Sequence, residues 1–564
     1  MWVKILLLFF VFSFLFKSDH SFDQDLGRHI KLGEIISQTS TVPKTNLFSY
    51  TNPDFPFVNT HWLFEVLAYL SSQTIGLQVL LILKVIIILL AVWLTLRIIP
   101  KDKSVLLLPI GFIFLHVLRE RTELRPEIFS FLFTALTIYI LDKYTSLRGA
   151  IATKQSSTWS IYLLPLIQLI WINTHIYFFV GLILQAIYLI QRIGAKLVHP
   201  PGGLRWHLLF FIFVASILIS LLNPNGLAGI LYPLNVSKNY GYTIVENQTM
   251  FFLENIGFAD PNFLFVKISL GLIALSLLVS LIRRKFNIKN ILLSFFGAGL
   301  ALLNVRSFPY LVFLSLPAVM ANFGPIKKGK LFSSLFLVSC IFLLAESLFY
   351  LNGDYYRYKE SDSTPGLKFI ESSKGALGFA LKNNLPGPVY NNFDIGSYII
   401  YRGYPKYQVF VDGRPEAFPA SFFANIYIHT QYDFKNFQEL DKIWKFQTII
   451  FSYTDQTQWG KNFLQSVVKD PNWNLVYIDD FILVLVKPDI ALEKKLATVD
   501  LATVNPDSYS FANHLSYLRL GLFLIGNKNF DSGSKFIQKT LQIFPQDPVA
   551  NSIIGQTSQN KFWW

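Results

Sequence analysis

The chain has 564 residues, of which 52% are hydrophobic and 16% aromatic, and it carries a formal net charge of +14. The apolar share exceeds that of an average soluble protein, and the surplus lies in the first 350 residues, in runs long enough to cross a bilayer. Basic membrane proteins usually owe their charge to the positive-inside rule, so we expect no nucleic acid as a partner. The single cysteine, Cys340, excludes an intrachain disulfide and a cysteine-rich metal cluster.

The first hydrophobic run is "MWVKILLLFFVFSFLF", and the polar stretch "SFDQDLGRHI" follows it closely. No small-x-small cleavage site precedes Ser21. The run therefore favours a retained membrane helix over a cleaved signal peptide.

The hydropathy pattern predicts eleven hydrophobic spans, several of them only about fifteen residues long. Spans this short indicate broken helices or a locally thinned bilayer. The fold class we predict is a polytopic α-helical membrane protein. The expected spans are about 2–17, 76–98, 104–118, 126–142, 160–174, 176–190, 207–222, 262–282, 290–304, 308–323 and 331–350.

The loops between these spans differ in charge. With the N-terminus inside, the five short inside loops hold sixteen Lys and Arg and one acid, Asp102, whereas the outside loops are longer and mix cations with acids. The positive-inside rule then predicts a multi-pass protein of the plasma (inner) membrane, with Asp23, Asp25 and everything after residue 350 outside the cytoplasm. The inside cations are Arg97, Lys101, Lys103, Lys143, Arg148, Lys154, Arg192, Lys196, Arg205, Arg283, Arg284, Lys285, Lys289, Lys327, Lys328 and Lys330.

Polar side chains recur at the outer ends of the expected spans, often in turns of only a few residues. Loop ends are commonly polar, so each residue alone is a weak signal. Because all of them lie at one depth, a folded bundle would bring them around one cavity. The set is Asp23, Asp25, Arg28, His29, His61, Glu65, Arg119, Arg121, Arg125, Glu127, Asn173, His175, Asn223, Asn225 and Arg306.

Lys84 interrupts "LQVLLILKVIIILLAVW", slightly on the outer side of the middle of the second span. A lysine there costs roughly 2.5–3.5 kcal/mol on insertion scales unless it finds a partner or snorkels. Two interpretations stay open: a phosphate contact reached from within the bilayer, or a snorkelling or buried structural lysine. Lys267, near the start of the eighth span, fits simple snorkelling.

Acids and cations at the outer edge of a membrane limit the classes of membrane protein that fit this sequence. An ion or proton transporter would carry ionisable groups at mid-membrane in repeated halves, and no such repeat is present. A transferase that uses a lipid-phosphate sugar needs a carboxylate as general base, cations for the leaving phosphate and an apolar flank for the lipid tail. The sequence offers all three.

The order of motifs resembles the GT-C glycosyltransferase superfamily, in particular bacterial members related to the dolichyl-phosphate-mannose mannosyltransferase and aminoarabinose transferase group. The resemblance covers about residues 1–350 and rests on "FDQDLGRHIKLGEII", "VPKTNLFSYT", "VNTHWLFEVL", "LRPEIFSFLF", "LIWINTHIYFFVGLIL", "LNPNGLAGILYPL" and "NVRSFPYLVF". It implies that the catalytic acid is Asp23 or Asp25 and that Arg125 and Arg306 hold the lipid phosphate. Gly27 and Arg28 stand where family members often have an aromatic pair.

The predicted function is therefore inverting transfer of a sugar from a polyprenyl-phosphate-linked donor to an acceptor outside the cytoplasm. The sequence does not distinguish a glycan, a lipid and a protein as the acceptor. It also leaves open whether a divalent cation, Mg²⁺ or Mn²⁺, binds at the two acids. In an extended loop these acids would share a face. The alternatives are a non-catalytic scaffold of the cell envelope and a lipid or polysaccharide transporter. The substrate-binding residues we expect are Arg28, His29, His61, Glu65, Lys84, Arg125, His175 and Arg306.

We expect three domains: a transmembrane domain over 1–350, an extracytoplasmic α/β domain over 351–489 and a helical tail over 490–564. Strands are expected in "GPVYNNFDIGSYIIY", "YQVFVDGRPE", "FQTIIFSY" and "WNLVYIDDFILVLVK", and helices near 368–384, 421–430 and 460–469. The "VDGR" turn at Asp412 to Arg414 is either a strand end or a group facing the membrane cavity. The tail is similar to one tetratricopeptide (TPR) helix pair, which would pack on the α/β domain or dock a protein partner.

Overall fold

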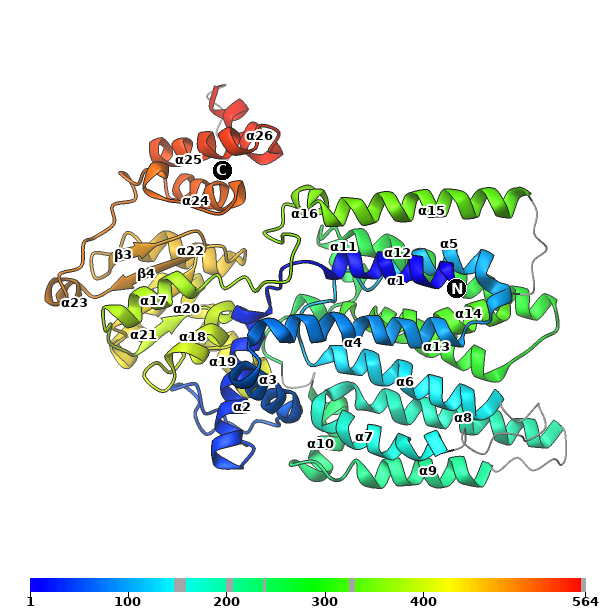
Figure 1. Cartoon of the computed structure of the whole chain (residues 1–564). Helices are drawn as coiled ribbons and strands as arrows, with labels where there is room; N and C mark the ends of the chain where they lie inside the picture. The colour runs from blue at the N-terminus through cyan, green and yellow to red at the C-terminus, as the bar shows by residue number, and fades with distance from the viewer. Residues whose placement is uncertain (147–158, 199–205, 237–239, 324–329, 559–564) are drawn as a thin grey trace.

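The computed structural model describes residues 1–146, 159–198, 206–236, 240–323 and 330–558. Of the expected inside cations, Arg148, Lys154, Arg205, Lys327 and Lys328 lie outside the described residues. A bundle of long helices forms one end of the molecule, a small α/β region forms the other, and a helical tail lies beside the α/β region (Figure 1).

Each expected span coincides with helical structure. Among the described residues, five helical segments are long and apolar enough to cross a membrane: Leu77–Ile98, Glu127–Thr145, Ile176–Gly194, Pro261–Ile282 and Ser333–Leu351. Shorter apolar helices occupy the other six expected spans. The protein thus has a polytopic helical fold, and the count of eleven crossings stays a prediction. The bundle helices are α1 Trp2–Leu15, α4 Leu77–Ile98, α5 Ser104–His116, α6 Glu127–Ser146, α7 Leu163–Thr174, α8 Phe179–Val198, α9 Trp206–Ile219, α12 Pro261–Ile282, α13 Ile288–Leu303, α14 Leu316–Asn322 and α15 Lys330–Leu351.

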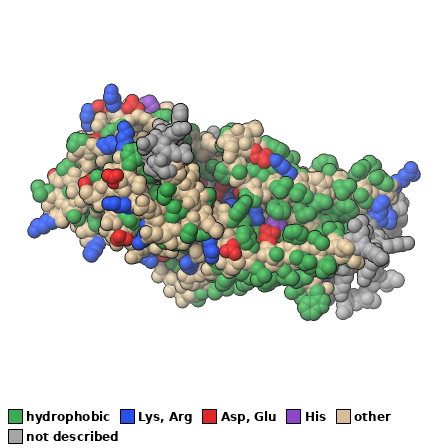
Figure 2. All heavy atoms as spheres, turned by 90° about the horizontal axis from the view of Figure 1, so that it is seen from above, with side chains coloured by type: hydrophobic (Ala, Val, Ile, Leu, Met, Phe, Trp, Pro, Cys, Tyr) green, Lys and Arg blue, Asp and Glu red, His purple; other side chains and the backbone are tan. Residues whose placement is uncertain are grey.

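Apolar side chains cover the outside of this bundle. On α15, Phe342 and Leu348 are 63% and 62% exposed, and on α9 Phe211 is 66% exposed. Figure 2 shows hydrophobic side chains over most of the bundle half and mixed charges over the other half. An exposed apolar surface of this extent marks a membrane-facing or partner-facing region, and its position on the predicted spans favours lipid.

At the end of the bundle that lies away from the sheet, basic side chains bind carbonyl groups at helix ends. Lys103 donates to the carbonyl of Phe323 at 2.5 Å, and Arg192 donates to the carbonyl of Thr145 at 2.6 Å. Helix C-termini carry unpaired carbonyl groups and partial negative charge, which cations stabilise. Two of the residues that produce the positive-inside pattern therefore have a structural role at the helix ends.

Two helices outside the bundle position the outer loops. Helices α2 Gly27–Thr39 and α3 Trp62–Thr74 pack against each other between the bundle and the α/β region (Figure 1). Their contact is tight at Gly33, where an added Cβ would lie 2.0 Å from the carbonyl oxygen of Glu65. The Arg28 backbone N–H donates to Ser397 of helix α18 (Gly396–Gly403) at 2.9 Å, which ties α2 to the α/β region.

The α/β region contains a mixed four-stranded sheet in the order β1-β2-β4-β3. Strand β1 is parallel to β2, with Tyr390 opposite Ile449, and β4 is antiparallel to both β2 and β3. The strands are β1 Val389–Asn391, β2 Thr448–Ser452, β3 Asn474–Ile478 and β4 Ile482–Val486. The helices of this region are α16 Asp354–Tyr358, α17 Lys374–Lys382, α18 Gly396–Gly403, α19 Ala420–Phe422, α20 His429–Tyr432, α21 Phe434–Trp444, α22 Gln458–Val467 and α23 Pro488–Glu493.

Of the four strand expectations, "YQVFVDGRPE" was wrong and "GPVYNNFDIGSYIIY" was right only for β1 at its start. The run "SYIIY" forms helix α18, and "VFVD" joins no strand of the sheet. Val409 instead bridges Ser49, and its N–H donates to the carbonyl of Phe48 at 2.9 Å. Both runs are buried, and a short buried apolar run does not distinguish a strand from a helix or from a segment covered by a distant loop.

The tail consists of α24 His514–Gly526, α25 Phe530–Ile543 and α26 Pro548–Ser558. Helices α24 and α25 form a close pair at Gly521 and Gly533, where an added Cβ on either glycine would meet the other's carbonyl oxygen. Arg519 forms an ion pair with Asp362, and Tyr453 contacts Phe523 with ring centroids 4.8 Å apart. The pair therefore packs on the α/β region, and its membership of the TPR class stays a prediction.

Candidate functional site

The stretch that contains both candidate acids is helical. Residues Phe22–Leu26 form a π-helical turn that continues directly into α2, so the extended loop considered from the sequence does not occur. As a result, Asp23 and Asp25 point to different partners.

Asp23 forms hydrogen bonds with the α/β region. Its two carboxylate oxygens accept the backbone N–H groups of Ser372 and Ser373 at 2.8 and 2.9 Å, immediately before helix α17. Burial raises the pKa of Asp23, although the bonds from Ser373 and Ser372 oppose that shift. Asp23 is 8% exposed and its oxygens hold the backbone before α17, so Asp23 is poorly accessible to a substrate.

Asp25 lies among guanidinium groups. Arg28 donates to its Oδ1 at 3.0 Å, and Arg125 forms an ion pair with its Oδ2 at 3.2 Å. A carboxylate has about four lone-pair positions, so these two contacts leave room for a further donor. The Asp25 side chain keeps 23% of its surface exposed.

Three arginines meet at one carboxylate beside Asp25. Arg121, Arg125 and Arg306 lie 2.5, 2.8 and 3.0 Å from the Glu246 oxygens. The first two come from the turn between α5 and α6, Arg306 comes from the short helix Val305–Ser307, and Glu246 lies between α10 Gly226–Asn235 and α11 Met250–Asn255. Burial raises the pKa of Glu246, but the three guanidinium groups outweigh burial and hold it well below its ordinary value.

These guanidinium groups have unused donors. The Nε atoms of Arg28, Arg121 and Arg306 are buried without a hydrogen-bond partner. Buried polar atoms usually have partners, and unpaired ones call for an explanation such as an absent ion or ligand. Planar guanidinium donors that converge on one point are suited to a carboxylate or phosphate.

A carboxylate–histidine pair lies next to this charged cluster. The Nδ1 atom of His29 is 3.0 Å from Oε1 of Glu65, and Asn59 donates to Oε2 of Glu65 at 2.6 Å. Burial lowers the pKa of His29 well below its ordinary value, with Arg28 acting in the same direction. Burial also raises the pKa of Glu65 to about 7, against the Asn59 hydrogen bond and the charges of Arg28 and Arg414.

Two further histidines continue from this pair. The ring centroid of His61 lies 5.7 Å from that of His29 and 5.5 Å from that of His175. Burial, followed by the charges of Arg28 and Arg306, lowers the pKa of His61 to about 3. His61 is therefore uncharged at neutral pH.

His175 and Tyr177 complete this side of the site. The Nδ1 atom of His175 lies 2.7 Å from Oγ of Ser130, which also accepts the indole N–H of Trp171 at 2.6 Å. Tyr177 stacks on His175 with centroids 5.4 Å apart, and its hydroxyl lies 2.8 Å from Oγ of Ser307.

The contacts close into a ring of side chains, hereafter the outer ring. It runs in the order Arg28, Asp25, Arg125, Glu246, Arg306, Ser307, Tyr177, His175, His61 and His29, where Arg306 and Ser307, and His29 and Arg28, are chain neighbours. Half of the ring is charged and half is neutral. Asp25, Glu246 and Arg306 each keep about a quarter of the side chain exposed.

The structure brings eight of the ten predicted site residues together and separates two. Asp23 faces the start of α17, and Lys84 is fully buried, with Nζ 2.8 Å from Oδ2 of Asp19. That ion pair is the structural alternative that the sequence left open for Lys84. The eight residues brought together are Asp25, Arg28, His29, His61, Glu65, Arg125, His175 and Arg306.

Asp19 is a residue that sequence reasoning missed. Beyond Lys84, it accepts the Ser21 hydroxyl at 2.5 Å and the Leu124 N–H at 2.8 Å. Burial opposes its ionisation, but Lys84 and the hydrogen bonds lower its pKa below the ordinary value. In the sequence, only its position as the first acid after the first span could have pointed to a role for Asp19. Nothing in the sequence around Glu246, Asn59 or Ser130 indicated that these residues belong to the site.

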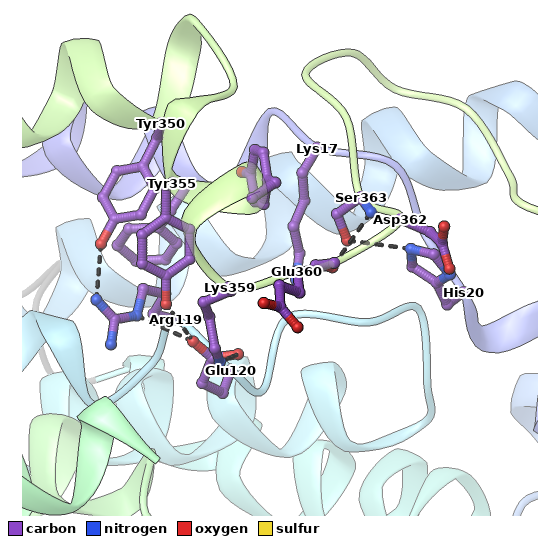
Figure 3. Close-up of a pocket in the computed structure, with 13 residues that line it drawn as sticks. Lys17, His20, Arg119, Glu120, Tyr350, Tyr355, Lys359, Glu360, Asp362 and Ser363 are labelled. Atoms are coloured by element: carbon purple, nitrogen blue, oxygen red, sulfur yellow. Dashed lines mark hydrogen bonds and ion pairs between the residues drawn. The ribbon is translucent and has the colours of Figure 1, made fainter. Parts of the chain in front are cut away.

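A separate cavity of about 380 Å³ lies between the end of α1, the α5–α6 turn and helices α15 and α16. Figure 3 shows Arg119 beside the Tyr350 hydroxyl, which it contacts at 2.9 Å, and Lys359 beside Glu120. Glu120 also accepts the hydroxyl of Tyr355 at 2.8 Å. Because these charges are paired within the cavity wall, we interpret it as a joint between the bundle and the α/β region.

The residues present do not fit a divalent cation at Asp23 and Asp25. The Asp23 oxygens accept backbone N–H groups, and the Asp25 oxygens face guanidinium groups, whose positive charge repels a metal ion. Within the described part of the chain, no group of three or more His, Cys, Asp or Glu side chains could hold a metal ion.

The comparisons with known proteins concern the fold. No family model and no curated protein matches the sequence. Among solved structures, the chain is similar to the archaeal oligosaccharyltransferase AglB from Archaeoglobus fulgidus, solved in complex with an inhibitory peptide and a dolichol-phosphate. The TM-score is 0.56 at 10% sequence identity, and the match covers 96% of this chain and 86% of the other. The likeness concerns the fold: this chain folds like that oligosaccharyltransferase over most of its length.

Proposed function

We propose that this protein is a membrane glycosyltransferase that moves a sugar from a polyprenyl-phosphate-linked donor to an acceptor, with inversion at the anomeric carbon. The observation that carries this proposal is the convergence of Arg121, Arg125 and Arg306 on one anion position beside Asp25. The dolichol-phosphate in the complex of the structural neighbour supports a lipid-phosphate donor.

The arginines would hold and stabilise the phosphate. The Glu246 carboxylate marks the point where three guanidinium groups favour negative charge. When the bond between the anomeric carbon and the phosphate oxygen breaks, the electron pair stays on the phosphate and its charge increases. Donors fixed before the reaction stabilise that charge without having to reorganise.

Asp25 is the carboxylate we assign as general base. The acceptor oxygen attacks the anomeric carbon from the face opposite the phosphate, and its proton passes to an Asp25 oxygen. Asp23 is the weaker candidate because it is only 8% exposed and its oxygens bind the backbone N–H groups of Ser372 and Ser373. The outer ring joins α2, the α5–α6 turn and the Val305–Ser307 helix, so folding holds the base beside the phosphate site.

The reaction takes place outside the cytoplasm in this proposal. The positive-inside pattern supports that orientation, with the outer ring and the α/β region on the same side. A reporter that is active only in the cytoplasm should be silent when fused after Trp564. Activity of that fusion would reverse the proposed orientation.

Turnover of a lipid-phosphate sugar tests the function. The full chain in lipid vesicles is given undecaprenyl-phosphate mannose, glucose or N-acetylglucosamine in turn, and release of the sugar to water or an acceptor is measured. We expect Arg125→Gln to abolish release and Arg357→Gln, at an exposed site outside the ring, to match the parent. Equal loss in both variants, or no release by the parent with any donor, would instead favour the scaffold interpretation.

A further inference from the structure

A side chain of the protein itself fills the anion position among the arginines. The Glu246 carboxylate lies 2.5, 2.8 and 3.0 Å from Arg121, Arg125 and Arg306. It therefore occupies the point that the proposed function gives to the donor phosphate. Two anions repel each other strongly among buried groups, where water screens little of their charge. A phosphate that binds at this point has to replace Glu246.

Glu246 lies on a segment with little packing of its own. It belongs to residues 240–249, hereafter the strap, which immediately precede α11. The short helix Val245–Asn247 contains no buried residue, and Val245 is 48% exposed. The Glu246 side chain keeps 26% of its surface exposed. Segments with few buried contacts open locally at a low cost in free energy, so the ion pairs of Glu246 contribute most of what holds the middle of the strap.

Both ends of the strap are anchored. Near its start, Tyr242 stacks on Phe393 of the α/β region, with ring centroids 4.5 Å apart. Near its end, the carbonyl of Gln248 accepts the Val305 N–H at 3.0 Å. The middle of the strap can therefore lift away from the arginines while its two ends stay beside the outer ring.

The charge balance favours an exchange of Glu246 for a phosphate. Glu246 contributes one negative charge, whereas a phosphate monoester contributes about 1.5 to 2 at neutral pH. Guanidinium groups also bind phosphate with paired hydrogen bonds. The cluster has room for the additional charge, because four guanidinium groups face three carboxylates: Arg28, Arg121, Arg125 and Arg306 against Asp25, Glu127 and Glu246.

We propose that Glu246 is an autoinhibitory stand-in for the lipid phosphate, which expels Glu246 and lifts the middle of the strap when it binds. This proposal rests on the proposed function and names how its phosphate site is regulated. The apparent affinity of any phosphate is reduced by the small fraction of molecules in which Glu246 has left. Free phosphate has the same head group but no lipid tail to add contacts, so it does not overcome this threshold.

Amide hydrogen exchange of the strap tests the displacement directly. The full chain in detergent micelles is incubated with undecaprenyl phosphate at a concentration that saturates the rise in its unfolding temperature. Exchange of peptides from 240–249 is then followed by mass spectrometry. We expect faster exchange with the lipid phosphate than without it, because the ion pairs of Glu246 are broken. Slower or unchanged exchange at saturation would mean that the phosphate binds beside Glu246, and would overturn the proposal.

Glu246→Gln keeps the size of the side chain and removes its charge. Without ligand, the strap of this variant should exchange as fast as that of the parent with lipid phosphate. Undecaprenyl phosphate should bind about tenfold tighter or more, and inorganic phosphate should now raise the unfolding temperature. Glu254→Gln is the matched control, because Glu254 forms an exposed pair with Lys267 and should leave both readouts as in the parent. Weaker binding of lipid phosphate by Glu246→Gln would identify Glu246 as a support of the site and refute its displacement.

Glu246→Asp separates occupancy from charge and serves if the Gln variant does not fold. It keeps the negative charge that compensates the arginines, but its shorter side chain cannot reach all three of them. We expect strap exchange and lipid-phosphate affinity between those of the parent and of Glu246→Gln. Values equal to those of the parent would contradict the displacement, since only the position of the carboxylate has changed.

Binding and turnover keep this proposal distinguishable from the proposed function. If lipid phosphate binds and the strap becomes protected, the displacement fails and the proposed function stands. If lipid phosphate lifts the strap but no sugar donor is consumed, the displacement stands and the transferase proposal fails. If undecaprenyl phosphate binds neither the parent nor Glu246→Gln, the phosphate site is wrong and both proposals fail.

Discussion

Replacing Lys84 by Met would leave Asp19 buried without its cation. Both side chains are fully buried and 2.8 Å apart, and removing one partner of such a pair typically costs 3–5 kcal/mol. Asp19 would retain its bonds from Ser21 and Leu124, which reduces the penalty. Protonation sets an upper limit, because neutralising a carboxyl of ordinary pKa 3.8 at pH 7 costs about 4 kcal/mol at 1.36 kcal/mol per unit. We therefore expect a loss of about 3–4 kcal/mol in the free energy of unfolding.

This loss should depend on pH. In the parent, the depressed pKa of Asp19 contributes stability that is present at neutral pH and lost as the pH falls through the folded-state pKa. In Lys84→Met, the uncompensated carboxyl is protonated in the folded state as the pH falls toward 5. At pH 5 the upper limit is only about 1.6 kcal/mol, so the difference between variant and parent should shrink.

Thermal unfolding in detergent micelles, followed by tryptophan fluorescence at pH 7 and pH 5, measures this difference. Asp19→Asn combined with Lys84→Met should recover part of the stability lost in the single variant, as expected for a coupled pair. Lys267→Met is the matched control, because Lys267 is 45% exposed and its pair with Glu254 should contribute at most about 1 kcal/mol. If Lys84→Met unfolds like the parent but loses donor use, the structural interpretation is refuted and a phosphate contact regains support.

Three further predictions concern the outer ring. Asp25→Asn should lower the rate of sugar transfer about 100- to 10,000-fold with stability retained, whereas Asp23→Asn should lower the unfolding temperature and change the rate little; the reverse pattern in initial rates and melting curves would exchange their roles. Sugar transfer should fall as the pH drops below about 7, because Glu65 then takes up a proton and no longer orients the His29 ring by accepting its Nδ1–H; a flat rate profile between pH 6 and 8 would argue against this link. Chelation with EDTA should leave transfer unchanged, since Asp25 faces guanidinium groups, and a loss restored by Mg²⁺ or Mn²⁺ would refute that reasoning.

The sequence alone determined the fold class, because hydropathy runs and loop charges are local properties of the chain. Each expected span coincides with helical structure, and the turns that carry Arg125, His175 and Arg306 are where the pattern predicted them. Most of the site followed from the same reasoning, because turns at one end of a bundle lie at one depth and their polar side chains can meet.

Only the tertiary structure decided which of these groups act on one another. Asp23 and Asp25 are equivalent in sequence, but a helical turn directs Asp23 at the backbone just before α17 and Asp25 at arginines. Lys84 was ambiguous until its partner Asp19 was placed by packing of α1 against α4. Glu246 has no distinguishing neighbours in the chain, and its role arises from three guanidinium groups brought from two distant turns. Such contacts depend on long-range packing, which no local pattern in a single sequence encodes.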